Sequence, residues 1–113
     1  MPNDSRPIKE KRVKDVVKKL LKEHGCYIFM PVQSGYGAAT LDIIGCHKTR
    51  FFSVETKAPG KKPSPRQELI MDMMNDAGAA VFVIGEAVMY KEDSMKTTFS
   101  GMAALEAWLL LGR

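Results

Sequence analysis

The chain has 113 residues, of which 45% are hydrophobic and 27% are charged. This length supports one domain, residues 1–113, because domains usually hold about 100–200 residues, and it allows a core without disulfides. The composition excludes a disordered chain, and the longest apolar runs, of about seven residues, are too short to cross a bilayer. No basic and then apolar leader opens the chain, so we expect a cytoplasmic protein with no membrane partner.

Positive charge gathers in two segments. Residues 1–23 hold eight Lys or Arg against four Asp or Glu, residues 47–68 hold six against two, and the rest is net acidic. Most charge runs are only a solvated surface. Two basic segments that meet in the fold would instead suit a polyphosphate ligand such as nucleic acid. The charge pattern by itself leaves both possibilities open.

The first predicted element is an amphipathic helix over residues 10–24, whose apolar residues recur at helical spacing. Gly25 suits the position after its end. A short strand is predicted at 26–32 and a glycine-containing loop at 33–39. The cysteines, Cys26 and Cys46, lack further ligands at zinc spacing, so we expect two reduced, buried thiols.

Strands at 40–46 and 50–57 are predicted to form an antiparallel hairpin. Ser64 begins a second helix, with Pro65 at its first position and Gln67 completing a capping box.

The apolar run 79–84 predicts a central strand, 88–91 a further short strand, and 102–111 a last helix. The sequence therefore predicts an α/β domain with a mixed central sheet flanked by helices, in the order α-β-β-β-α-β with a C-terminal helix.

Charged residues interrupt the hairpin where apolar ones are expected. Asp42 lies in an apolar strand, and Glu55 and Lys57 share one face of the next strand. If Lys48 and Thr49 form a two-residue turn, Asp42 stands opposite Glu55, with Cβ atoms about 4.5–5.5 Å apart. Two such carboxylates destabilise each other unless a cation lies between them, and hard oxygen ligands favour Mg²⁺ or Mn²⁺.

A third carboxylate, Glu10, lies within the apolar stripe of the first helix, at its N-terminal end. Each residue also has a plain explanation. Glu10 favours the helix dipole, and Asp42 suits a strand entry. Glu55 with Lys57 suits an exposed cross-strand pair, and Gln67 suits a helix cap alone. One metal ion would explain all three carboxylates together.

Asp42, followed by Glu55-Thr56-Lys57 on the next strand, matches the D…(D/E)-x-K signature of restriction-endonuclease-like nucleases. Further matching segments are the glycine-containing approach 34–45, the segments 54–60 and 64–67, and the entry to a strand at 76–81. This order resembles the VRR-NUC domain, a virus-type replication-repair nuclease module, over roughly residues 8–90. Leu41 departs from the family, which often has proline before the aspartate.

The resemblance implies a restriction-endonuclease-like core and a metal site. Asp42 and Glu55 would ligate Mg²⁺ or Mn²⁺, helped by the main-chain carbonyl of Thr56. Glu10 would complete the shell directly or through water.

It also implies that Lys57 orients the attacking water or neutralises the scissile phosphate, and that Gln67 positions Lys57 or the water. The basic residues expected to hold the nucleic-acid backbone are Lys9, Lys61, Lys62 and Arg66.

The expected activity is that of a structure-specific DNA endonuclease for branched DNA such as four-way (Holliday) junctions, working as a homodimer in a bacterial or phage-infected cell. The methionine-rich second helix or the helix with Trp108 could supply the dimer face, although we expect most of these residues in the core. The alternatives are a non-catalytic nucleic-acid-binding module and a nuclease subunit that cuts only beside a helicase-type partner.

Overall fold

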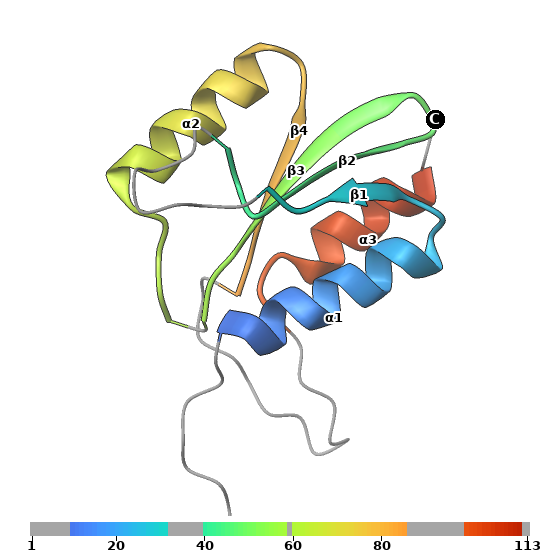
Figure 1. Ribbon diagram of the computed structural model, residues 1–113, viewed down its shortest axis with the longest axis horizontal. Helices are drawn as coiled ribbons and strands as arrows, with labels where there is room; N and C mark the ends of the chain where they lie inside the picture. Colours follow the sequence, from blue (N-terminus) through green and yellow to red (C-terminus); the bar gives the residue numbers. More distant parts are fainter. Residues whose placement is uncertain (1–9, 32–39, 59, 86–98, 112–113) are drawn as a thin grey trace, which may run out of the picture.

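A computed structural model describes residues 10–31, 40–58, 60–85 and 99–111. Within them lie three helices and a mixed sheet of four strands in the order β1-β2-β3-β4. The elements are α1 (Glu10–Glu23), β1 (Tyr27–Phe29), β2 (Ile43–His47), β3 (Arg50–Thr56), α2 (Pro65–Asp76), β4 (Ala80–Ile84) and α3 (Met102–Leu111). Helices α1 and α3 cover one face of the sheet and α2 lies on the other (Figure 1). The predicted α/β class and element order are confirmed; the loop at 33–39 and the strand at 88–91 fall outside the described residues.

Helix α1 is amphipathic as predicted. Its fully buried residues are Val13, Val17 and Leu21. Gly25, with φ of 77°, ends the helix in the left-handed region, and the Cys26 N–H donates to the Leu21 carbonyl at 3.0 Å. Because that N–H caps the helix, β1 begins one residue later than predicted, at Tyr27.

The hairpin of β2 and β3 has the predicted register, from His47 opposite Arg50 to Ile43 opposite Val54. Lys48 and Thr49 form the turn with φ of 50° and 70°, the positive values that a two-residue hairpin turn with matching twist requires.

Strand β2 starts later than the predicted residue 40. The N–H of Thr56 donates to the Asp42 carboxylate at 3.0 Å and not to a strand carbonyl. This side-chain acceptor ends the ladder next to Ile43 and leaves Asp42 at the strand entry.

Helix α2 begins as predicted. Ser64 Oγ accepts from the Gln67 N–H at 3.1 Å, and Gln67 Oε1 accepts from the Ser64 N–H at 2.9 Å. Pro65 holds the first helical position, where its missing N–H is no loss.

After α2 the chain returns through β4, which pairs in parallel with β3 from Phe52–Ala80 to Thr56–Ile84. The prediction of a central strand at 79–84 is wrong for the described sheet, in which β4 is the last strand. The apolar sequence of β4 is explained by the helices on both faces of the sheet. A strand that is covered on both faces needs apolar residues whether it lies at the centre or at the edge of the sheet.

The core lies between the sheet and helices α1 and α3. Its largest buried residues include Phe52, Leu21, Ile43, Ile84 and Leu105. Trp108 packs edge-on against Phe52 and Phe82, with ring centroids 5.5 and 5.6 Å away, so it belongs to the core.

Two expectations about burial are wrong. Helix α2 buries Ile70, but Leu69 and Met73 are each 60% exposed because the helix packs on the sheet with one side only. Both cysteines are free, but Cys46 is exposed and Cys26 half-buried, because Cys46 alternates onto the sheet face away from the core. Among the described helices, none is long and apolar enough for a membrane span.

Candidate active site

The sequence-predicted residues meet where β3 ends. Figure 1 shows this end of β3 close to the start of α1, with β4 ending beside it. Asp42 precedes β2, Glu55 and Thr56 end β3, and Gln67 lies in the first turn of α2. The carboxyl ends of parallel strands are a common place for ligand sites in α/β proteins.

Asp42 is held firmly by β3. One oxygen of its carboxylate, Oδ2, accepts from the Thr56 N–H at 3.0 Å and from the Thr56 hydroxyl at 2.7 Å. The other oxygen, Oδ1, lies 3.9 Å from Nζ of Lys14, which comes from α1. The side chain is only 8% exposed, so these contacts fix the direction in which the carboxylate points.

Glu55 is the most buried acid of the site, with 1% exposure. Its Oε2 accepts from Nε2 of Gln67 at 2.6 Å and lies 3.5 Å from Nζ of Lys57. Its Oε1 is buried without a hydrogen-bond partner. A carboxylate oxygen in that state is costly, because it has lost water and gained nothing in exchange.

The charges of the site act on one another. Burial and the Asp42 charge raise the pKa of Glu55 to about 7, although Lys57 and a main-chain hydrogen bond from Asp42 lower it; Glu10 raises it further. The pKa of Glu10 is raised by burial and by Asp42 and lowered by Lys57 and Lys14. The three predicted carboxylates thus share one electrostatic environment.

No three Asp, Glu, His or Cys side chains within the described ranges stand close enough together to hold a metal ion as they are. Asp42 and Glu55 nevertheless fit a hard divalent cation. They meet at adjacent strand ends, repel each other, and leave Oε1 of Glu55 buried and unbonded. A cation between them would relieve both penalties. The expected role of Thr56 is to offer its main-chain carbonyl to the metal. In the structure its N–H and its hydroxyl donate to the Asp42 carboxylate, a contact that this expectation does not include.

Sequence reasoning missed Lys14. It lies one helical turn after Glu10, and that spacing places the two residues on the same side of α1. Its ammonium group and that of Lys57 approach the acidic pair from different elements, α1 and the end of β3.

The expected DNA-binding residues Lys61, Lys62 and Arg66 are all exposed, between β3 and the first turn of α2. Lys9 lies outside the described residues.

Neither the protein-family models nor the curated proteins contain a match to this chain. The chemistry of the site therefore has to be judged from its own geometry. That geometry combines a buried acid pair, an unbonded carboxylate oxygen and two ammonium groups, which together can bind a divalent cation and a phosphate.

Proposed function

We propose that this protein is a Mg²⁺- or Mn²⁺-dependent endonuclease that hydrolyses phosphodiester bonds in branched DNA. One observation carries the proposal. Two carboxylates from neighbouring strands, Asp42 and Glu55, meet beside the Lys57 ammonium group, and Oε1 of Glu55 lacks a partner. Burial and the charge of Asp42 both disfavour the ionised form of Glu55, and a cation between the two carboxylates would offset that cost.

Each side chain has a defined part. Thr56 fixes the Asp42 carboxylate through two hydrogen bonds, and Gln67 fixes that of Glu55 through one. When bound, the cation would polarise the scissile phosphate and offset negative charge in the transition state. Lys57, with a side chain 16% exposed, can donate from Nζ to a phosphate oxygen or to the attacking water.

The substrate class follows from charge and from the resemblance to VRR-NUC domains. Exposed Lys61 and Lys62 lie between β3 and α2, and exposed Arg66 lies in the first turn of α2, next to Gln67 of the site. Such residues grip phosphates without reading bases, which favours recognition of DNA shape over sequence. A four-way junction needs paired cuts, and a symmetric homodimer would make them.

The test is cleavage of a synthetic four-way junction in Mg²⁺ or Mn²⁺ by the wild type, Asp42→Asn and Glu55→Gln. Each variant should bind the cation poorly and so lose several kcal/mol of transition-state stabilisation. Cleavage should therefore slow by about 10³-fold. Asp15→Asn is the matched control, because Asp15 is an exposed acid of α1 that pairs with Lys11 outside the site.

The proposal is wrong if the wild type leaves junctions, forks and flaps uncut in both metals. Junction binding that ignores EDTA and never leads to a cut would indicate the non-catalytic binding module. Cleavage that appears only after a helicase is added would indicate the partner-dependent subunit.

A further inference from the structure

Four lysines form a stripe along α1, at positions 11, 14, 18 and 22 of the chain. With 3.6 residues per turn, they fall within an arc of about 80° around the helix. The arc borders the buried side of the helix, beside Leu21. Lys14 and Lys18 are accordingly half-buried, whereas Lys11 and Lys22 are exposed.

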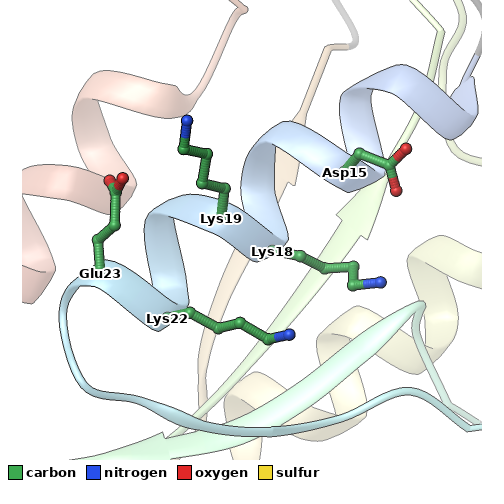
Figure 2. A pocket seen from close by; sticks show the side chains of 5 residues that line it. All are labelled: Asp15, Lys18, Lys19, Lys22 and Glu23. Atoms are coloured by element: carbon green, nitrogen blue, oxygen red, sulfur yellow. The ribbon is translucent and has the colours of Figure 1, made fainter.

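The stripe reaches the candidate active site at Lys14, whose Nζ is 3.9 Å from Asp42. Lys18 and Lys22 follow at about 6 and 12 Å from Lys14 along the helix axis. Figure 2 shows Lys18 and Lys22 extending to the same side of α1, whereas Lys19 and Glu23 extend in other directions. These side chains surround an open hollow on the protein surface, which Asp15 also lines.

Two lysines of the stripe have no ion-pair partner among the described residues, although Asp15 and Glu23 also line the hollow. Within the described part of the chain, Lys11 pairs with Asp15 at 3.3 Å, but no carboxylate pairs with Lys18 or Lys22. Like charges four residues apart destabilise a helix. Lys18 and Lys22, which are unpaired and continue along the helix from Lys14 at the acidic site, are therefore better explained by an anionic ligand than by stability of the helix.

We propose that Lys14, Lys18 and Lys22, which we call the lysine ridge, bind successive phosphates of the DNA strand that leaves the active site. The inference rests on the nuclease function proposed above and adds a path for the substrate. A length of about 12 Å along α1 corresponds to about three or four nucleotides of one duplex strand. The ridge makes no base contacts and would hold any sequence.

The experiment measures binding of a fluorescent four-way junction in Ca²⁺, in place of Mg²⁺, between about 50 and 200 mM salt. The ridge variant is Lys18→Ala/Lys22→Ala. The matched control is Arg12→Ala/Lys48→Gln, which removes the same charge from two exposed positions that do not line the hollow. Thermal unfolding of both variants checks that α1 remains intact.

The ridge variant should bind about tenfold more weakly, and its slope of log K against log salt should be shallower by about 1.8, or about 1.4 if the bound strand is single. The control should keep the wild-type slope. Equal losses in both double variants, or no loss in either, would overturn the lysine ridge.

A second measurement locates the contacts. Neutral methylphosphonates placed within about four nucleotides of the cut should weaken binding of the wild type but not of the ridge variant. If the wild type cuts the junction in Mg²⁺ and this difference is missing, only the ridge is wrong. If the wild type binds the junction without cutting it, the nuclease proposal fails. The lysine ridge is then still tested by the salt dependence of binding in the ridge variant and in the control.

Discussion

Glu55 shows how one residue can be structurally unfavourable and chemically useful. Gln67 and Lys57 contact one of its oxygens, and the other oxygen is buried without a partner. Burial and the nearby Asp42 carboxylate raise its pKa to about 7. The folded protein therefore holds a proton on Glu55 at pH values where the unfolded chain has already lost it.

This difference predicts a dependence of stability on pH. Ionisation of Glu55 should lower the free energy of unfolding as pH rises from the ordinary pKa of 4.5 to about 7, with no further loss above that. The expected loss is on the order of 3 kcal/mol. Urea unfolding in EDTA should show this loss in the wild type but not in Glu55→Gln. Glu106→Gln, an exposed acid of α3, is the control and should keep the wild-type dependence.

Thr56→Val removes the hydroxyl that donates to Asp42 at 2.7 Å and keeps the shape of the side chain. We expect a loss of about 1–2 kcal/mol in stability. Cleavage should also fall by about tenfold, because Asp42 turns more freely. Ser53→Ala is the matched control, since its buried hydroxyl donates to the Ile43 carbonyl. Ser53→Ala should lose comparable stability but cleave at the wild-type rate. Equal cleavage rates in Ser53→Ala and Thr56→Val would contradict a positioning role for Thr56.

Among the elements, α2 is tied to the site by the side chain of Gln67. Gln67 accepts from Ser64 through Oε1 to cap the helix and donates through Nε2 to Glu55. The expected plain role of Gln67 as a cap is confirmed, and the structure adds the contact with Glu55. The start of α2 and the acidic pair are therefore one connected unit.

Gln67→Glu should separate the two contacts. Glutamate also completes a capping box, so unfolding in EDTA at low pH should change little. Above the pKa of the carboxylates, the new charge faces Glu55, and cleavage should fall by at least about tenfold. Ser64→Ala is the comparison, expected to cost about 1 kcal/mol of stability. If Ser64→Ala lost as much cleavage as Gln67→Glu, the contact with Glu55 would have no special importance.

Local sequence signals predicted most of the elements. The periodicity of α1, the turn at Lys48 and Thr49, and the cap at Ser64 all operate within a few residues, so they can be read along the chain. The place of β4 and the exposed side of α2 could not be read in this way. Both depend on how far the sheet extends and on which neighbours cover each face, and these are long-range packing outcomes.

Part of the site could also be predicted from local signals along the chain. Hairpin register placed Asp42 near Glu55, because strand pairing follows from counting outward from the turn. Lys14 and the two hydrogen bonds from Thr56 to Asp42 were not foreseen, because they depend on the packing of α1 and on the exact end of the ladder. Metal binding, activity and the homodimer stay predictions.

At the scale of the whole molecule, cation binding should stabilise the fold. A ligand that binds only the folded state, at about 100 times its Kd, adds about 2.7 kcal/mol. Thermal unfolding near neutral pH should therefore shift upward by several degrees in Mg²⁺ or Mn²⁺ relative to EDTA. Asp42→Asn should abolish the shift and Asp15→Asn should keep it; the same shift in both would place the ion elsewhere.

The tight turn at Lys48 and Thr49 has a consequence for engineering. It lies six or so residues from the acidic pair, about 20 Å along the strands. If the turn kept two residues, one amino acid inserted there would offset β2 against β3 by a single step, and every side chain of one strand would swap sides. Asp42 and Glu55 would then point away from each other without either having been altered, so the length of this turn sets the geometry of a site about 20 Å away.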